Sequence, residues 1–385
     1  MSQPTPPPGS LGPPSTPPGL RRALVAGGVV AAVLAAVLLV PRGGEEPDPT
    51  AGPAPTGPTT GTPGTTAPAS PEPTSESPSP TPEAPSPTPA PGPTSYDRVV
   101  VVTLDGTGSQ YVTPDTTPAL WGLLQDGAGT LNARTETELT LTLPNHTSMV
   151  TGRPIIGALG GHGVTWNSDD PRSVLPGVES VFTSIAAAGG QSIAIAGKSK
   201  FEMWGRAWPA AVAPQLFDTQ DAVVRAGVQA IRADDAALVF VHLPDNDSAG
   251  HADDWGSASY LDAVADTDAD LARLARAARR IGAALVVTAD HGGPRGQDQH
   301  GAAGDPQNYT IPFVVAGPGI PAGDLYALSP TRVDPGTAQP AYPDAAPVRN
   351  GDVANLVLDL LGLPPVPDSR LDADQDLLPG AAPAG

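Results

Sequence analysis

The stretch RVVVVTLDG, residues 98–106, decides the fold that we predict for this chain. Its valines form a continuous apolar run with no polar residue at alternate positions. Such a run requires a strand that is covered on both faces, as in a parallel sheet between two layers of helices. Ligands gather beyond the carboxyl ends of the strands in these sheets, so Asp105, at the end of this run, is the first candidate site residue.

Four more apolar runs follow along the chain, and segments with helical periodicity lie between them. The runs are SIAIAGK (residues 192–198), AALVFVHLPD (236–245), AALVVTADHGG (283–293) and TIPFVVAGPG (310–319). The helical segments are residues 178–190, 222–231 and 260–280, where apolar residues recur on one face. This alternation predicts an α/β domain of three layers, with a mostly parallel central sheet between helices.

The N-terminal quarter of the chain has a different composition. The first 95 residues hold 26 of the 50 prolines and no Phe, Trp or Tyr, so they cannot bury a core. Within them, residues 23–40 carry no charge and approach the about 17–25 apolar residues that span a bilayer. Arg21 and Arg22 precede this segment, which predicts a transmembrane signal anchor with residues 1–22 in the cytoplasm. The alternative is a cleaved signal peptide, for which no small-x-small site follows the apolar run.

The rest of the chain divides by composition into three parts. Residues 41–95 are rich in Pro, Thr and Ser, and we expect a disordered linker of up to ~170 Å when fully extended. We place one α/β domain at residues 96–365 and a flexible tail at residues 366–385. No cysteine is present, and the formal charge of −20 argues against nucleic-acid binding, which needs a basic surface.

Acidic residues and histidines follow the carboxyl ends of three predicted strands. They are Asp105 after the first run, Asp247 and His251 after the third, Asp290 and His291 at the end of the fourth, and His300 in the loop beyond it. A parallel sheet brings these loops to one edge, and oxygen and nitrogen donors of this kind predict a metal site. The alternative for any single histidine is a hydrogen-bonded structural role, which we assign to His242. For His146 and His162 we expect either such a role or a position directly behind the metal ligands.

Six motifs, in their order along the chain, resemble the alkaline phosphatase superfamily, most closely its type I phosphodiesterase/nucleotide pyrophosphatase branch. They are TLDG, TLPNHTSMVTG, HGVTWN, DSAGH, TADHGG and QHG. The resemblance covers residues 96–363 and implies a three-layer α/β/α fold with two zinc ions, manganese being the alternative metal. One ion would be bound by Asp105, Asp290, His291 and the Thr142 hydroxyl, and the other by Asp247, His251 and His300. The resemblance also implies that Asn167 contacts the phosphate.

Thr142 is the predicted nucleophile. A threonine hydroxyl is scarcely ionised at neutral pH, but coordination to a metal lowers its pKa. A short helix is expected directly after Thr142, and its free N–H groups favour a phosphate. We therefore expect a phosphothreonine that water then hydrolyses. The alternative is that Thr142 only caps the helix.

Two residues and one segment bear on which substrate the protein would bind. Leu143 stands where the resemblance implies a phenylalanine that stacks on a nucleotide base, so nucleotide preference stays open. The segment FEMWGRAW, residues 201–208, offers other aromatic surfaces, with core packing as the alternative. Lys198 could meet an anionic substrate, with a solvent-exposed lysine as the alternative.

Together these features predict a membrane-anchored, extracytoplasmic, metal-dependent phosphodiesterase or nucleotide pyrophosphatase. Its substrate would be a small phosphodiester or nucleotide-like molecule. Two alternatives stay open: a phosphomonoesterase of the same superfamily, and a non-catalytic module displayed on the cell surface. Asn167 favours diesters, because monoesterases of the superfamily bring more positive charge to the phosphate. The sequence does not specify the oligomeric state.

Overall fold

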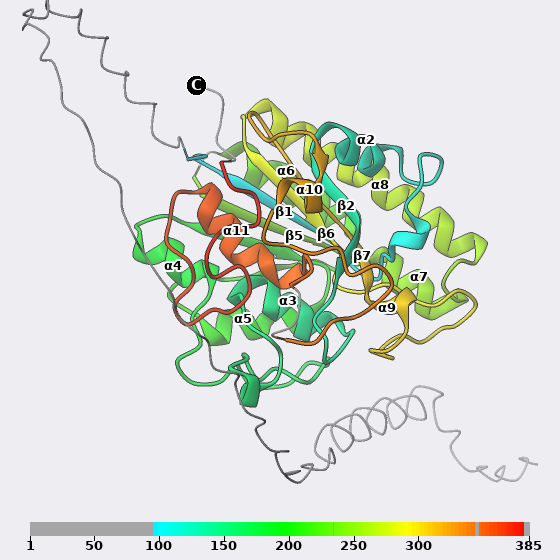
Figure 1. Cartoon of the computed structure of the whole chain (residues 1–385), viewed down its shortest axis with the longest axis horizontal. Helices are drawn as coiled ribbons and strands as arrows, with labels where there is room; N and C mark the ends of the chain where they lie inside the picture. The colour runs from blue at the N-terminus through cyan, green and yellow to red at the C-terminus, as the bar shows by residue number, and fades with distance from the viewer. Residues whose placement is uncertain (1–94, 234, 343–345, 381–385) are drawn as a thin grey trace, which may run out of the picture. The chain divides into compact units, whose positions relative to one another are not determined.

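The computed structural model describes residues 95–233, 235–342 and 346–380 (Figure 1). Its centre is an eight-stranded sheet with the order β4-β3-β5-β1-β6-β7-β2-β8. The strands are β1 (Val99–Leu104), β2 (Ala128–Arg134), β3 (Ser192–Ala196), β4 (Gln215–Leu216), β5 (Leu238–Leu243), β6 (Ala284–Thr288), β7 (Thr310–Ala316) and β8 (Gly323–Asp324). Strand β1 lies between β5 and β6 and is parallel to both. The predicted α/β class with a mostly parallel sheet is confirmed.

Strand β7 is the exception to the parallel arrangement, because it runs antiparallel to both β6 and β2. The chain leaves β6 at the carboxyl edge of the sheet and enters β7 after the short helix α9 (Pro306–Tyr309). No long crossover helix carries it back to the other edge within this described segment, so β7 must return in the opposite direction.

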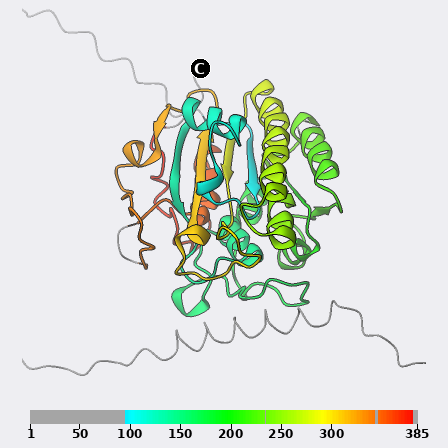
Figure 2. The ribbon, with the colours of Figure 1, turned by 90° about the vertical axis from the view of Figure 1, so that its right-hand side faces the viewer.

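Helices cover both faces of the sheet (Figures 1 and 2). One layer contains α3 (Thr142–Thr151), α4 (Val181–Ala187), α5 (Glu202–Ala207) and α11 (Val353–Leu360), and the other contains α2 (Pro118–Asp126), α6 (Gln220–Ala233) and α8 (Ala258–Arg280). Val99 and Val101 pack into the first core, whereas Val100 and Val102 pack into the second. The continuous valine run is therefore explained by two buried faces.

Two further helices directly follow strands of the sheet. Helix α7 (Asp245–Asp253) follows β5 directly, and α10 (Leu325–Leu328) follows β8. Helix α7 packs on α8, and a small aromatic core of Tyr111, Trp255 and Tyr260 lies beside them. This core is important for the site, because Trp255 and Tyr260 both donate hydrogen bonds to the carbonyl oxygen of Gly106, at 3.0 and 2.9 Å.

The structure bears differently on the predictions for the two ends of the chain. The predicted anchor at residues 23–40 and nearly all of the linker at 41–95 lie outside the described residues. Among the helices of the described part, none has the length and apolar character needed to cross a membrane. Residues 366–380, for which we expect a flexible tail, instead pack on the domain: Leu377 and Leu378 are buried, and Arg370 N–H bonds to Gly152 O at 2.7 Å.

Candidate metal centre

Three buried carboxylates meet at the carboxyl edge of the central strands. Asp105 follows β1, Asp247 lies in the first turn of α7 after β5, and Asp290 follows β6. All three side chains are almost fully excluded from solvent. Because β5, β1 and β6 are neighbours in the sheet, the fold brings together acids that are far apart in the sequence.

Each carboxylate uses one oxygen within the protein and leaves the other without a partner. Asp105 Oδ2 accepts from His242 Nε2 at 2.8 Å and pairs with Lys198 Nζ at 2.6 Å. Asp290 Oδ1 accepts from the N–H groups of Gly106 and His291, at 3.0 and 2.9 Å. Asp247 Oδ2 pairs with Lys198 at 2.5 Å. The remaining oxygens, Asp105 Oδ1, Asp247 Oδ1 and Asp290 Oδ2, find no hydrogen-bond partner among the described residues, and neither does His291 Nε2.

Three of the four unpartnered atoms have the spacing of ligands that share one metal ion. Two ligands about 2.0–2.1 Å from a tetrahedral zinc lie roughly 3.3–3.4 Å from each other. His291 Nε2 is 3.4 Å from both Asp105 Oδ1 and Asp290 Oδ2, and these three form the first group. Buried polar atoms without partners are costly, so a cation is the group that this arrangement fits.

A second group lies around Asp247. Asp247 Oδ1 is 3.4 Å from His251 Nε2 and 3.5 Å from His300 Nε2, which again suits a shared ion. His291 Nε2 lies 3.8 Å from the same oxygen and so connects the two groups. All six predicted Asp and His ligands therefore lie in one centre. His251 is the most accessible of them, with 39% of its side chain exposed.

The imidazoles are held in the tautomer that a metal requires. Each of the three donates through Nδ1 to a backbone carbonyl: His251 to Asp298, His291 to Gly292 and His300 to Thr140, at 2.8, 2.9 and 2.7 Å. Nε2 is then left as the free lone pair. Burial lowers the pKa of His291, and it lowers the pKa of His300 further, so both rings are neutral at pH 7. Neutral imidazole is the ligand form.

The carboxylates differ in protonation because their neighbours differ. Burial pushes the pKa of Asp105 upward, but Lys198, His242 and His291 outweigh it and hold the pKa well below its usual range. Burial together with the charges of Asp105 and Asp247 raises the pKa of Asp290 well above its usual range. Asp290 is therefore the member of the cluster that holds a proton when no cation neutralises the site.

Lys198 is a central part of this cluster. Its ammonium lies between Asp105 and Asp247, only 17% of its side chain is exposed, and both carboxylates raise its pKa despite burial. The alternative of a solvent-exposed lysine is therefore wrong. Lys198 contacts Oδ2 of both carboxylates. The unpartnered Oδ1 atoms of Asp105 and Asp247 therefore remain available in the two ligand groups.

Thr142 is the first residue of α3 and is buried. The residue at the cap position is Leu141, and no side chain caps this helix, so the alternative of Thr142 as a helix cap is wrong. The Thr142 hydroxyl therefore makes no capping hydrogen bond at the start of α3. Two contacts hold its backbone beside the centre: His300 donates to Thr140 O, and His146 Nδ1 donates to Thr142 O at 2.9 Å.

Asn167 lies at the N-terminal end of α3. Its Oδ1 accepts from Leu143 N–H at 2.9 Å and from Lys200 Nζ at 3.1 Å. These two bonds orient the amide and leave its Nδ2 hydrogens available to an anion. Sequence reasoning missed Lys200, although the signal was present: the KSK triplet follows β3 at the same edge of the sheet.

The remaining histidines and aromatic residues have supporting roles. His242 orients Asp105 and itself accepts from Gly197 N–H at 3.3 Å. His146 Nε2 bonds to Thr103 at 2.9 Å, and His162 bonds to Ser148 at 3.0 Å on the far side of α3. Phe201, Trp204 and Trp208 are buried in the core, so the packing alternative holds for them.

Gly106 explains how two of the acids approach so closely. Its φ is +72°, and an added Cβ would lie 2.9 Å from the Cα of Asp247. A side chain at this position would therefore strain the backbone and separate the strand ends that carry Asp105 and Asp247. The glycine of the TLDG motif is needed for the spacing of the two ligand groups.

Two family models match the chain. The type I phosphodiesterase / nucleotide pyrophosphatase model matches residues 99–175, and the metalloenzyme superfamily model matches residues 210–329. The first range includes Asp105, Thr142 and Asn167, and the second includes the other five predicted site residues. These matches confirm the resemblance predicted from the motifs.

Similar proteins each share part of the chain. The 2,3-bisphosphoglycerate-independent phosphoglycerate mutase of Halobacterium salinarum is 29% identical over 163 residues, which are 40% of this chain and 25% of that protein. Murine ectonucleotide pyrophosphatase / phosphodiesterase 5, an inactive variant in complex with AMP, is 21% identical at a TM-score of 0.42, over 51% of this chain and 57% of that one. The C-terminal periplasmic domain of EcEptC from Escherichia coli, in complex with Zn, is 14% identical at a TM-score of 0.48, over 75% and 88%.

The chain thus spans a quarter of the length of the mutase and 57% of the murine protein. What is shown is the resemblance to phosphoryl-transfer metalloenzymes and a set of Asp and His groups that can hold metal ions.

Proposed function

We propose that this protein is a metal-dependent phosphodiesterase or nucleotide pyrophosphatase that uses Thr142 as its nucleophile and two metal ions, zinc or manganese. The observation that supports this most directly is the set of four buried, unpartnered ligand atoms beside the first turn of α3. Bound ions would lower the pKa of a coordinated hydroxyl and neutralise charge on the phosphoryl oxygens.

The residues around Thr142 suit an in-line displacement at phosphorus. The Thr142 hydroxyl gives up its proton to solvent, its oxygen bonds to phosphorus, and the leaving group departs with the electrons of the broken P–O bond and takes up a proton from water. Water then attacks the phosphorus of the phosphothreonine, the Thr142 oxygen leaves with the electrons of its P–O bond and regains a proton, and the phosphate product is released. The positive end of α3 and the Asn167 amide favour the negative phosphoryl oxygens throughout.

The burial of the residues near Thr142 bears on whether the substrate must contain a nucleotide base. Leu143 is fully buried, so it presents no surface on which a base could stack. Because Phe201 and Trp204 are also buried, the described aromatic residues that were expected to form walls are unavailable for this purpose. We therefore propose a phosphodiester bond as the substrate class without a requirement for a nucleotide base.

Phosphomonoester hydrolysis is the second candidate, and one observation favours it. The preference for diesters assumed little positive charge near the phosphate, yet Lys200 lies 3.1 Å from Asn167 and Lys198 lies within the cluster. A phosphomonoester carries an additional negative charge that a lysine at this place would stabilise.

Hydrolysis of two chromogenic substrates by the full-length protein tests both candidates. We expect bis-(p-nitrophenyl) phosphate to be cleaved with zinc or manganese present and EDTA to stop the reaction. Faster cleavage of p-nitrophenyl phosphate, weakened about tenfold or more by Lys200→Met with the diester rate less affected, would instead support the monoesterase. If neither substrate is cleaved by the metal-loaded protein, the non-catalytic surface module is the better description.

We also propose that residues 23–40 anchor the protein in the cell membrane with the catalytic domain on the extracytoplasmic side. The support is the uncharged apolar segment preceded by Arg21 and Arg22. In intact cells, an added protease should release the domain into the medium. Deletion of residues 23–40 should move the protein out of the membrane fraction, and a domain that stays protected from protease until lysis would contradict this orientation.

A further inference from the structure

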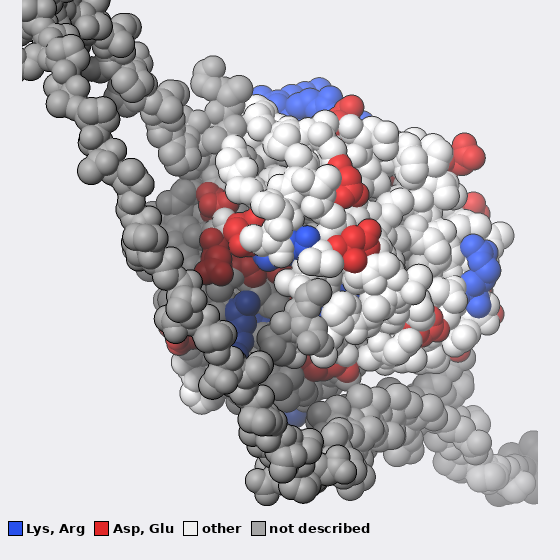
Figure 3. Space-filling view, viewed as in Figure 1, with Lys and Arg blue, Asp and Glu red and all other residues white. Residues whose placement is uncertain are grey.

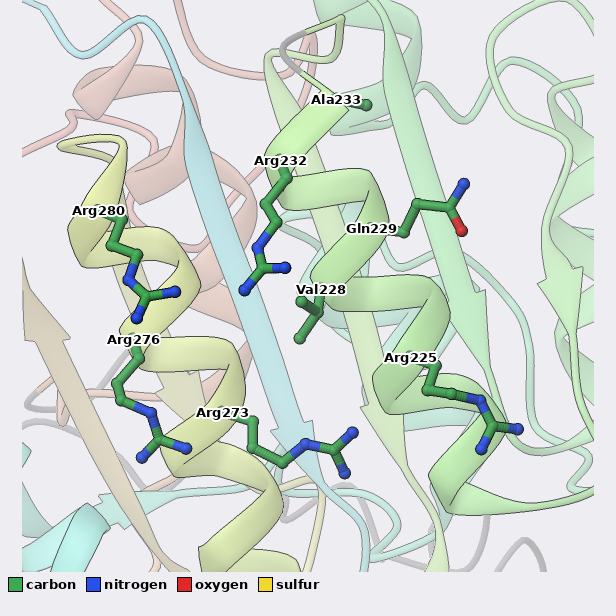
Figure 4. Close-up of a pocket in the computed structure, with 8 residues that line it drawn as sticks. All are labelled: Arg225, Val228, Gln229, Arg232, Ala233, Arg273, Arg276 and Arg280. Atoms are coloured by element: carbon green, nitrogen blue, oxygen red, sulfur yellow. The ribbon is translucent and has the colours of Figure 1, made fainter.

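A groove lined by arginines lies between helices α6 and α8 (Figure 4). Its volume is about 670 Å³, and its arginines are Arg225 and Arg232 from α6 and Arg273, Arg276 and Arg280 from α8. In the view of Figure 3, the most prominent basic area of this face lies at its upper edge, over the C-terminal end of α8. The groove stands out because the whole chain carries a formal charge of −20.

Arg232 on α6 faces the arginines of α8, whereas the side chain of Arg225 extends away from α8 (Figure 4). Arg273, Arg276 and Arg280 are three and four positions apart and therefore share one face of α8. Arg232 points from α6 toward them across the groove (Figure 4). Like charges that face each other in this way destabilise the protein unless anions neutralise them.

Carboxylates neutralise only one end of the groove. Arg225 forms an ion pair with Asp221, and Arg273 pairs with Asp270 at 2.8 Å and with Asp221 at 3.6 Å. For Arg232, Arg276 and Arg280 the described residues offer no ion pair. The C-terminal helix dipole accounts for basic residues in a last turn, such as Arg232 and Arg280, but Arg276 lies before that turn.

The groove is separate from the metal centre. Its helices end just before β5 and β6 begin, whereas Asp247 and Asp290 follow the ends of these strands. Strands of five or six residues separate the two edges by about 20 Å. The chain also enters β1 from the groove's edge of the sheet, where Arg98 bonds to Ile231 O at 2.8 Å. A ligand in the groove is therefore not the substrate of the centre.

We propose that this groove binds an anion with several phosphate groups through Arg232, Arg276 and Arg280. Guanidinium groups bind phosphate oxygens in pairs, and three of them from two helices suit a ligand with phosphates in succession. Phosphates of this kind are found in soluble polyphosphate chains and in the headgroups of an anionic lipid surface. Both sources place the same chemistry in the groove.

Binding of tripolyphosphate and of lipid vesicles to the full-length protein tests the proposal. The matched pair is Arg276→Gln and Arg279→Gln: both arginines are exposed on α8 and lose the same charge, but Arg279 does not line the groove. We expect Arg276→Gln to weaken tripolyphosphate binding about tenfold and Arg279→Gln to change it little. Diester hydrolysis and Tm should be the same in both variants, which shows that they are folded.

The vesicle arm separates the two sources. Vesicles of phosphatidylcholine with and without phosphatidylglycerol are compared, and only the difference between them counts, since residues 23–40 could bind any bilayer. If phosphatidylglycerol strengthens vesicle binding and Arg276→Gln reduces this gain, the groove binds lipid headgroups. If phosphatidylglycerol gives no gain but tripolyphosphate still binds, the groove binds soluble phosphates. The proposal is overturned if neither probe binds, or if Arg276→Gln and Arg279→Gln weaken binding equally.

Discussion

Replacing Thr142 by alanine is expected to lower kcat for the diester about 10⁴-fold or more, while the protein keeps both metal ions. A loss of this size corresponds to about 5 kcal/mol of transition-state stabilisation. The reason is that the hydroxyl would form the bond to phosphorus, whereas Asp105, Asp290 and His291 still supply three ligands of the first group. Single-turnover kinetics and metal analysis by mass spectrometry measure the two quantities separately.

Thr151→Ala is the matched control for this substitution. Thr151 lies on the same helix and is equally buried, but its hydroxyl bonds to Thr147 O at 2.7 Å, at the other end of α3. Its loss should cost about 1 kcal/mol of stability and leave kcat nearly unchanged. A second check is labelling: a trapped phosphoenzyme should carry phosphate on Thr142 in the wild type and none in Thr142→Ala. Normal turnover by Thr142→Ala would exclude the assignment.

The central strands and the gathering of the acids and histidines could be predicted because both depend on local sequence. Four valines in a row are compatible with few environments, and the structure divides them between two cores. The acids and histidines sit directly at strand ends, so knowing the sheet is enough to bring them together. The same holds for α8, whose apolar stripe predicts it at residues 260–280.

The features that the sequence did not reveal depend on contacts between distant residues. The sequence around Lys198 does not distinguish it from a surface lysine. The pairing of β3 with β5 places it between Asp105 and Asp247. The C-terminal residues lack periodicity, yet Arg370 and Leu371 bond to Gly152, more than two hundred positions earlier. Strand β2 mixes polar and apolar residues and has no continuous apolar run, so it is identified as a strand only by its pairing with β7.

Removing the metal ions, or one of their ligands, is expected to abolish activity without unfolding the domain. EDTA should reduce diester hydrolysis to background, and zinc should restore it. At a 1,000-fold excess over Kd, zinc should raise Tm by about 10 °C, because an ion that binds only the folded state stabilises it by about 4 kcal/mol. The unpartnered oxygens of Asp105, Asp247 and Asp290 are the expected contacts.

Asp290→Asn tests this most sharply. The amide keeps an oxygen for the N–H groups of Gly106 and His291 but replaces Oδ2, the unpartnered ligand atom, by an NH₂ group that cannot bind a cation. Burial and the charges of Asp105 and Asp247 raise the pKa of Asp290, so without metal the wild-type residue is already uncharged and asparagine resembles it. The metal-free variant should therefore be at least as stable as the metal-free wild type, yet lose one ion and its activity.

Two comparisons complete the experiment. Asp268→Asn is the control, because Asp268 is also buried but binds the N–H groups of Ala119 and Leu120 at the start of α2. It should lose stability and keep the metals. Metal must also displace the proton of Asp290 in the wild type, so zinc affinity should fall as pH falls below the raised pKa, and calorimetry should detect proton release. If Asp290→Asn retained both ions, the first ligand group would be assigned incorrectly.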